Sequence, residues 1–370
     1  MCPNSAAKRN WNYKLTNNVK EEHGHPIYCV AFNFIGDCNN DIFASCGATR
    51  ATIYRCHAGG KIEIVQAYLD DDENEEFYAV KWSVNVSTGA PLLLLAGKRG
   101  LLKVLDTETE TLTRCLEGHG DAINDISVHP LKHSLVLTAS RDSALRLWNI
   151  ETNVCVLIIH GDGGHLNEVL SIDFHPFHGE QFLSSGMDNT VKIWSLTGMQ
   201  EHIESSYAHD ASKGKVFHTR QLACPTFSSH KVHFNYVDCV RWMGDLIVSK
   251  SVKDRIFVWQ PDVKDDIVGT KGLVHLLHEM DMEDAHVWFV RFAMDKRCRT
   301  LACGNRQGTV FVWDPQDMDR KPAARLRREA PPASSRAHTT TRQTAVSADG
   351  STIISCCDDS TIWRWDVQGA

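Results

Sequence analysis

Short apolar segments recur along this chain at intervals of about 50 residues. Each repeat ends in a strand of alternating apolar and polar residues, in which successive side chains point to opposite faces. Seven of these strand ends align, and most of them close on Trp followed by a polar residue. They lie at residues 53–54, 104–106, 145–149, 191–195, 256–260, 310–314 and 362–366.

A matching strand start precedes each strand end and is marked by two spaced residues, apolar in nearly every repeat. The pairs are Val30/Phe32, Val80/Trp82, Ile126/Val128, Ile172/Phe174, Val240/Trp242, Val290/Phe292 and Thr344/Val346, of which the last is the weakest. Self-similarity at a fixed period predicts one repeat architecture, in which stacked units share a core, instead of a series of unrelated domains.

Polar residues recur between the strands at fixed distances from the closing Trp. Two histidines stand 29 residues before the Trp of their repeat, and three aspartates stand six before theirs: His119, His165, Asp142, Asp188 and Asp359. This spacing resembles the WD-repeat signature, and the resemblance implies a hydrogen-bond network of Asp, His, Ser or Thr, and Trp within a blade. Both histidines are therefore expected to be structural, because buried polar groups need partners.

Seven such units predict an all-β, seven-bladed WD-repeat β-propeller. The last repeat closes at Asp366, too near Ala370 for another strand, so residues at or near 13–16 are expected to supply it and to close the ring without an exposed edge. We expect an N-terminal arm over 1–22, part of which completes the last blade, and a propeller over 23–367. The predicted blades lie approximately at 23–60, 77–110, 119–155, 165–197, 235–262, 287–317 and 342–367.

Three long insertions are expected between the repeats, at 198–233, 261–284 and 315–341. The second is acidic at 262–266, and the third is rich in Pro, Ala and Arg, a composition typical of a solvated loop. The alternative interpretation of the third insertion is a nuclear-import signal formed by Arg325, Arg327 and Arg328.

Composition narrows the classes of partner. The formal net charge of -7 argues against sequence-independent binding to nucleic-acid phosphates and is compatible with a basic partner. No segment resembles a signal peptide, and the longest aliphatic run, 92–95, is far too short for a membrane span, so we expect a soluble, intracellular protein. The 13 cysteines include no CxxC pair, and we expect all of them to be buried thiols of a reducing compartment.

The motifs of common enzymes and metal sites are missing from the sequence: it has no Gly-rich phosphate loop, nucleophile elbow, zincin motif or calcium loop. We therefore predict no catalytic residue, no metal and no cofactor. The segment His23-Gly24-His25 lacks a third ligand and is expected to be a variant blade opener. The acidic run 70–76 is typical of a solvated loop.

Alignment of the seven strand starts also identifies one residue per blade at the mouth of the central channel, two positions before the first apolar residue. In chain order these register residues are Tyr28, Tyr78, Asn124, Leu170, Asp238, Trp288 and Arg342. The three aromatics and Arg342 belong to blades six, seven, one and two, which are consecutive in a closed ring. We therefore expect Tyr28, Tyr78 and Trp288 to face a common space, with Phe289 a candidate for a further wall; a core position is the alternative for each aromatic taken singly.

Several aromatic faces around one space suit a quaternary ammonium ion. The faces carry negative potential, and each contributes about 0.5–2 kcal/mol. After association costs, this predicts a weak site, of about micromolar order or poorer. The acidic run 70–76 lies just before Tyr78 and is expected to attract basic residues that flank a methyl-lysine in a histone tail.

Several stretches of the chain, covering about residues 23 to 367, resemble the embryonic ectoderm development and extra sex combs family of Polycomb WD-repeat proteins, nearest to its plant branch named fertilization-independent endosperm. The stretches are 118–121, 145–151, His165 with 168–171, 235–242, 246–251, 342–344, 349–354 and 361–366. The third insertion, 315–341, has no counterpart in this resemblance.

The resemblance implies a nuclear, non-catalytic core subunit of Polycomb repressive complex 2. In this family one face of the propeller holds the Enhancer-of-zeste histone methyltransferase subunit. The other binds trimethyl-lysine of the histone H3 tail, the lysine-27 mark, in an aromatic cage and thereby stimulates the enzyme. Other subunits of the complex are implied partners, whereas a membrane or direct sequence-specific nucleic-acid binding is not. The cage maps to Tyr28, Tyr78, Trp288 and Phe289, and the positions that flank the peptide map to Tyr236 and Arg342.

Two departures and two alternatives bear on this interpretation. Animal members carry Phe where Tyr28 stands and Tyr where Phe289 stands, so a ring is kept at both positions. The first alternative is a general WD-repeat adaptor, such as a ubiquitin-ligase substrate receptor without methyl-lysine selectivity. The second is a catalytic propeller, which needs an acid–base or metal constellation near the channel that the sequence does not show.

Overall fold

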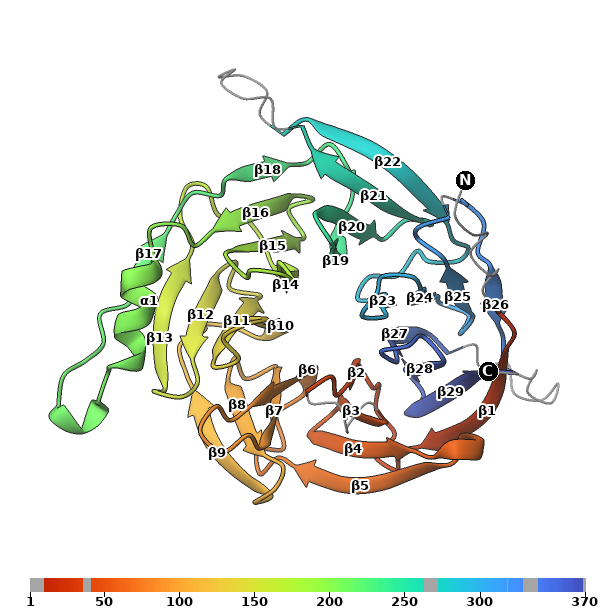
Figure 1. Ribbon diagram of the computed structural model, residues 1–370, viewed down its shortest axis with the longest axis horizontal. Coiled ribbons are helices and arrows are strands. Elements are labelled where there is room, and N and C mark those ends of the chain that lie inside the picture. Colours follow the sequence, from red (N-terminus) through yellow and green to blue (C-terminus); the bar gives the residue numbers. More distant parts are fainter. Residues whose placement is uncertain (1–9, 36–40, 263–271, 318, 329–338, 369–370) are drawn as a thin grey trace, which may run out of the picture.

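Each predicted repeat forms one sheet of mainly antiparallel strands, and seven such sheets are arranged like blades around a common centre (Figure 1). The computed structural model describes residues 10–35, 41–262, 272–317, 319–328 and 339–368. Within each blade the first strand lies innermost and the later strands follow outward. The predicted all-β, seven-bladed WD-repeat propeller is confirmed.

The first four blades contain, from the inside outward, the following strands. Blade one has β2 (Cys29–Phe32), β3 (Ile42–Gly47), β4 (Arg50–Cys56) and β5 (Ile62–Leu69), and blade two has β6 (Phe77–Val84), β7 (Pro91–Gly97), β8 (Leu102–Asp106) and β9 (Thr111–Leu116). Blade three has β10 (Ile123–Val128), β11 (Leu135–Ser140), β12 (Leu145–Asn149), β13 (Val154–Ile159) and β17 (Arg220–Leu222), and blade four has β14 (Val169–Phe174), β15 (Gln181–Gly186), β16 (Val191–Ser195) and β18 (Phe227–Ser229).

The remaining blades follow the same order. Blade five has β19 (Val237–Met243), β20 (Leu246–Ser251), β21 (Arg255–Pro261) and β22 (Val274–Asp281), and blade six has β23 (Ala293–Met294), β24 (Leu301–Gly304), β25 (Val310–Trp313) and β26 (Ala324–Leu326). Blade seven has β27 (Thr341–Val346), β28 (Thr352–Cys357), β29 (Thr361–Val367) and β1 (Tyr13–Lys20), while the short helices are η1 (Ala58–Gly60), α1 (Gln200–Tyr207) and η2 (Ala211–Lys213).

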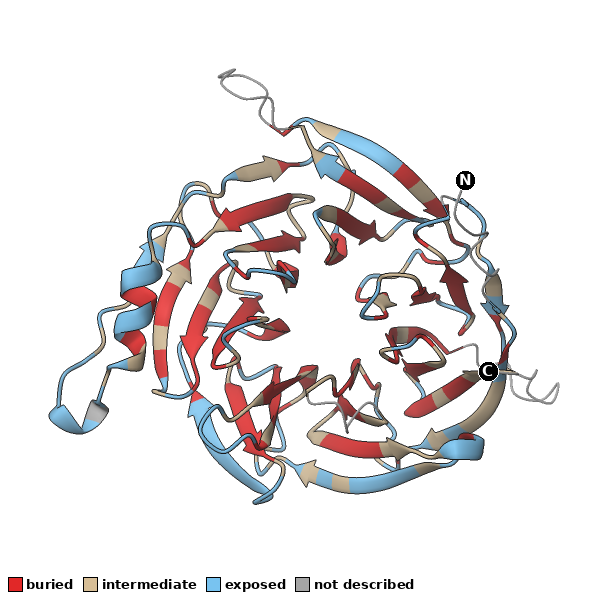
Figure 2. Ribbon diagram, in the orientation of Figure 1, coloured by how far each residue is buried: buried red, intermediate tan, exposed pale blue. Residues whose placement is uncertain are grey.

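Burial decreases from the inner strands to the outer ones (Figure 2). Every residue of β8 is buried, whereas all residues of its outer neighbour β9 except the last are exposed. The apolar core consists of clusters shared by neighbouring blades, one of which joins Leu147 and Val156 of blade three to Phe182 and Trp194 of blade four. A blade therefore buries its faces only when its neighbours are in place.

The N-terminal strand closes the ring as the fourth strand of blade seven. β1 pairs antiparallel with β29 from Tyr13↔Val367 to Lys20↔Thr361. Immediately after β1 the buried Glu21 carboxylate accepts hydrogen bonds from the Ser45 hydroxyl at 2.8 Å and the Tyr54 hydroxyl at 2.6 Å, both in blade one. The N-terminal segment thus joins the last blade to the first.

The predicted networks of blades three and four are present. His119 contacts Asp142 at 2.9 Å and Thr138 at 2.7 Å, and the Trp148 indole N–H donates to the same Thr138 hydroxyl at 2.8 Å. In blade four the corresponding residues are His165, Asp188, Ser184 and Trp194, with distances of 2.9, 2.7 and 2.8 Å. Both histidines therefore have the structural role that was predicted.

Blade five contains a third network that the sequence reasoning missed. His233 contacts the Ser249 hydroxyl at 2.7 Å, and the Trp259 indole N–H donates to that hydroxyl at 2.9 Å. His233 stands 26 residues before Trp259 instead of 29, so a search at fixed spacing does not find it.

The structure differs from the predicted strand pattern in two respects. In blade six the inner strand is limited to Ala293–Met294, and the predicted pair Val290/Phe292 precedes it. The Arg291 N–H between them donates to the Arg342 carbonyl of blade seven at 2.8 Å. In blades one, two, four, five and six the outer strand begins after the predicted end of the blade segment, as β5 does at Ile62. The outer strands β5 and β9 are largely exposed, and their alternation is too weak to mark them in the sequence.

The insertion 198–233 folds back over blade three before it completes blade four. Its helix α1 packs against β13, and β17 pairs with β13 in parallel as a fifth strand, which the sequence did not predict. The chain then returns as β18 to form the outer strand of blade four.

Of the insertion 261–284, residues 263–271 lie outside the described residues, and with them most of the acidic stretch 262–266. In the insertion 315–341, residues 318 and 329–338 lie outside the described residues. Two arginines of the possible import signal have partners within the protein: Arg325 pairs with Glu283 at 2.7 Å and Arg328 lies 4.8 Å from the Trp363 ring centre.

The expectation that all cysteines are buried is wrong for five of the eleven among the described residues, because Cys56, Cys155 and Cys298 are partly exposed and Cys115 and Cys224 are exposed. Cys115 lies on the exposed outer strand β9, and Cys224 follows β17 within the insertion 198–233. All eleven cysteines among the described residues are free thiols. Within the described ranges no helix is long and apolar enough to cross a membrane.

Replacing His165 by Ala should lower the free energy of unfolding by about 2–3 kcal/mol, because Asp188 and Ser184 lose a buried hydrogen-bond partner. Urea unfolding followed by tryptophan fluorescence measures this loss. His160→Ala removes an exposed imidazole nearby and should change stability by less than about 0.5 kcal/mol. Equal losses in the two variants would contradict the structural role of the network.

Candidate aromatic site at the channel mouth

Four aromatic rings from three blades lie next to one another at the starts of the inner strands. The Tyr28 ring centre lies 5.2 Å from that of Tyr78 and 5.7 Å from that of Phe289. Phe289 lies 6.0 Å from Tyr78 and 5.7 Å from Trp288, and all four contacts are edge to face. The structure thus brings together the four rings that the sequence singled out.

The four rings differ in exposure. Trp288 is 45% exposed, Tyr28 and Tyr78 are partly exposed, and Phe289 is only 5% exposed. The Phe289 ring is therefore buried, whereas the other three rings are accessible. The adjacent residues Trp288 and Phe289 thus differ in burial.

The backbone explains why two neighbouring side chains share one site. Phe289 has φ 62°, in the left-handed region that an aromatic residue seldom adopts. This bend breaks the alternation of an extended strand, in which adjacent side chains point to opposite faces. Backbone strain of this kind persists only where the surroundings enforce it, and it is concentrated at functional sites.

Residues of blades five and seven hold the bend through polar contacts. The Arg342 guanidinium donates to the Trp288 carbonyl at 3.0 Å and forms a two-point ion pair with Asp358, at 2.6 and 2.9 Å. The Val290 N–H donates to the buried Asp238 carboxylate at 3.1 Å. Both sides of Phe289 are thus fixed by charged groups that are themselves paired.

Arg291 supports the bend from below. Its guanidinium lies 4.4 Å from the centre of the Phe289 ring and donates to the carbonyls of Asn124, at 2.5 Å, and Leu170, at 3.0 Å. Arg291 is thus a fully buried cation of blade six that reaches across the centre of the propeller to blades three and four.

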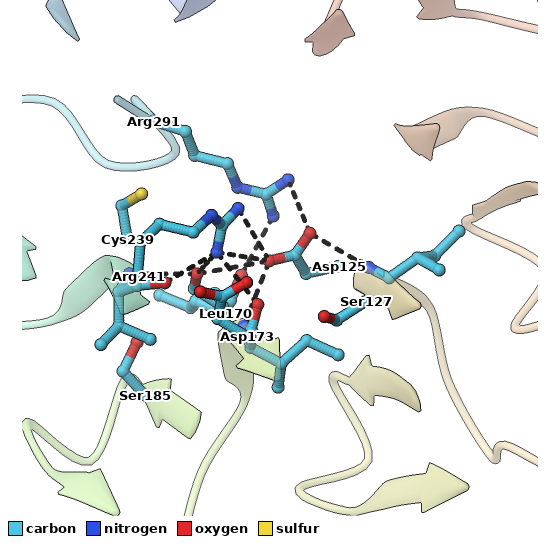
Figure 3. A network of polar contacts seen from close by, with 12 residues as sticks. Asp125, Ser127, Leu170, Asp173, Ser185, Cys239, Arg241 and Arg291 are labelled. Carbon is cyan, nitrogen blue, oxygen red and sulfur yellow. Dashed lines mark hydrogen bonds and ion pairs between the residues drawn. The ribbon is translucent and has the colours of Figure 1, made fainter. Parts of the chain in front are cut away.

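The charge of Arg291 belongs to a network at the centre of the propeller (Figure 3). Asp125 lies between two guanidinium groups, at 3.6 Å from Arg291 and 3.3 Å from Arg241. Burial acts to raise the pKa of Asp125, but the charges of the two arginines outweigh it and hold this pKa below its ordinary value. The carboxylate is therefore charged, as the two buried arginines require.

The carboxylate of Glu76 lies beside Tyr28 and Tyr78. Its Oε2 atom accepts a hydrogen bond from the Tyr78 hydroxyl at 3.0 Å. Burial, followed by the charge of Glu76, raises the pKa of Tyr28 to about 12 and also raises the pKa of Tyr78. Both phenols therefore stay protonated at neutral pH, and the Tyr78 hydroxyl is engaged as a donor to Glu76.

The two residues predicted to flank a peptide have different surroundings. Tyr236 is 40% exposed and immediately precedes β19 in blade five, next to blade six. Arg342 lies 5.9 Å from the Tyr28 ring centre, but its guanidinium is already engaged by Asp358 and the Trp288 carbonyl. Arg342 is therefore built into the wall of the site.

Four residues that shape the site were not assigned to it from the sequence: Glu76, Asp238, Arg291 and Asp358. Arg291 did carry a signal, because it is a charge between the core residues Val290 and Phe292. Within the described residues, no group of three His, Cys, Asp or Glu side chains is arranged to hold a metal ion.

Comparison with known proteins gives consistent results. The WD domain, G-beta repeat family matches residues 110–149, 154–195 and 331–366. The chain is 43% identical to the Polycomb group protein FIE2 of Zea mays over 345 residues, covering 93% of this chain and 89% of the relative. It is 38% identical to the Polycomb protein esc of Drosophila melanogaster over 364 residues, covering 96% and 84%.

Among solved structures, the chain is similar to one in the structure of ctPRC2 in complex with H3K27me3 and H3K27M, from Chaetomium thermophilum. The TM-score is 0.79 over 97% of this chain and 98% of the other, with 20% sequence identity. At this identity the similarity shows the fold alone.

The burial difference between the two adjacent aromatics predicts different stabilities for their alanine variants. Trp288→Ala should lower the free energy of unfolding by less than about 1 kcal/mol, whereas Phe289→Ala should lower it by about 3 kcal/mol, because it removes a buried ring. Urea unfolding of both variants measures the difference. An unfolded Trp288→Ala variant would mean that this indole belongs to the core.

Proposed function

The chain belongs to the Polycomb group family of WD-repeat proteins that includes FIE2 and esc, and from this premise we propose that it is a non-catalytic subunit of a Polycomb repressive complex 2. We propose further that it binds trimethyl-lysine of the histone H3 tail, the lysine-27 mark, between Tyr28, Tyr78, Trp288 and Phe289. In this role it works in the nucleus and supports gene silencing.

The observation that carries the proposal is the group of four rings, with centres 5.2 to 6.0 Å apart in the contacting pairs, at one mouth of the channel. A trimethylated ammonium has no N–H to donate and is readily dehydrated, so ring faces suit it better than carboxylate pairs do. Each face contributes about 0.5–2 kcal/mol. A chain of similar fold occurs in a complex whose description includes H3K27me3, which supports the choice of mark.

The opposite ends of the inner strands offer a second surface for the methyltransferase subunit. A cavity of about 570 Å³ lies there, lined among others by Trp82, Phe177, Trp242 and Met294. Its lining combines apolar side chains with charged ones, among them Lys81, Asp173 and Arg241, so it offers both apolar and polar contacts to a partner segment. We propose that the Enhancer-of-zeste type subunit docks on this face, so that it and the histone tail do not compete.

Titration with H3-tail peptides tests the binding proposal. The protein should bind the trimethyl-lysine 27 peptide with a dissociation constant of about 10–100 µM and the unmodified peptide at least about tenfold more weakly. Trp288→Ala should abolish binding, while Phe177→Ala, which removes an exposed ring at the opposite mouth, should not. Equal affinity for both peptides would favour a general WD-repeat adaptor instead.

Reconstitution with the Enhancer-of-zeste type subunit and the other subunits of the complex tests the output. The trimethylated peptide should increase histone methylation by the wild-type complex. The Trp288→Ala complex should assemble equally well but stay at the basal rate, because only the peptide site is lost. Stimulation of the Trp288→Ala complex, or methyl transfer by the purified chain alone, would contradict the proposal.

A further inference from the structure

Glu76 places a carboxylate directly behind the aromatic site. It immediately precedes Phe77, the first residue of β6, and its Oε2 atom accepts the hydrogen of the Tyr78 hydroxyl at 3.0 Å. Its charge also acts on Tyr28, the ring that lies 5.2 Å from Tyr78. One carboxylate therefore polarises two of the four rings.

Three of the five neighbouring acids in the run 70–76 have a cationic partner within the protein. Asp70 and Glu75 pair with Lys103, and Asp72 pairs with Arg99. In the described part of the chain, no Lys, Arg or His nitrogen lies within 4.0 Å of the Glu76 carboxylate. The negative charge of Glu76 is thus left uncompensated beside the site.

Two arginines whose charges act on these tyrosines do not supply the missing counter-charge. Arg342 is held by Asp358 at 2.6 and 2.9 Å, and Arg141 is held by Glu168 at 2.7 Å. Each of these cations is matched by its own carboxylate. A cation that enters between the rings would therefore meet the unmatched charge of Glu76.

We propose that Glu76 is a specificity-determining residue of the aromatic site and selects a cationic side chain over an uncharged one of the same shape. The inference rests on the proposed function, because it concerns the same site. Aromatic rings alone also hold apolar groups through the hydrophobic effect. A phenol that donates to a carboxylate gains electron density, which makes its face more attractive to a cation.

The test compares two ligands that differ only in charge. One is an H3-tail peptide with trimethyl-lysine, and the other carries its uncharged carbon isostere, which ends in a tert-butyl group. Glu76→Gln keeps an oxygen that can accept the Tyr78 hydroxyl but removes the charge. Glu73→Gln removes an equal charge from an exposed position in the same run and is the matched control.

Glu76→Gln should weaken binding of the trimethyl-lysine peptide about fivefold and leave binding of the isostere peptide within about twofold. Glu73→Gln should leave both affinities within about twofold, because its carboxylate faces solvent. The preference of the wild-type protein for the charged peptide should decrease as salt is added, since ions screen the Glu76 charge.

Other results would contradict either the inference about Glu76 alone or the proposed function as well. Equal weakening of both peptides by Glu76→Gln would mean that Glu76 only positions the rings, and unchanged affinities would mean that it has no role; either overturns the inference while the proposed function stands. If the wild-type protein binds neither peptide, the proposed function fails and the inference fails with it.

Discussion

The pairing of β1 with β29 is the contact on which the aromatic site depends. The site takes rings from blades six, one and two, while Arg342 of blade seven braces it, so it spans the seam where the ring closes. Tyr28 and Trp288 are 260 residues apart in the chain, and only closure brings blades one and six to either side of blade seven. Closing so long a loop carries an entropic cost that the hydrogen bonds of β1 and the buried Glu21 must offset.

Closure alone does not set the geometry of the site, because Phe289 must also adopt a left-handed backbone conformation. The protein enforces it with charges buried at the centre: Arg291 under the ring and Asp238 on the following N–H. Asp238 is paired with Lys250 at 3.1 Å, and neither side chain is exposed. Buried ion pairs seldom add net stability, but removal of one partner is strongly unfavourable. Their role here is to fix one arrangement of the bend.

Structural features that recur from blade to blade could be predicted from the sequence, whereas features found at a single position could not. Seven strand pairs, the networks of His119 and His165, and the family membership now confirmed by relatives all follow from recurring residues or matching stretches. The register that groups Tyr28, Tyr78 and Trp288 followed from the same repetition, because equivalent positions of consecutive blades meet at the channel mouth.

Features found at a single position leave no repeating pattern from which they could be predicted. A positive φ at Phe289 arises from contacts with residues far along the chain, and the outer strands are set by pairing instead of by their own alternation. In the sequence Glu76 was one of six acids in the run 70–76, which was interpreted as a solvated loop or as a group that attracts basic residues flanking a methyl-lysine. Only the fold shows that Asp70, Asp72 and Glu75 are paired with Lys103 or Arg99, whereas Glu76 has no cationic partner among the described residues and accepts the Tyr78 hydroxyl.

The two ends of the inner strands are separated by a rigid polar layer. Arg241 lines the cavity at one end and contacts Asp125, which contacts Arg291, and Arg291 lies under Phe289 at the other end. Because Asp125 joins the two arginines, and Arg291 also donates to carbonyls of blades three and four, the rings above this layer are held in place before any ligand arrives. A site that is already formed loses little conformational entropy on binding. A few ring faces and one unmatched carboxylate are then sufficient for the weak, charge-dependent recognition proposed for this protein.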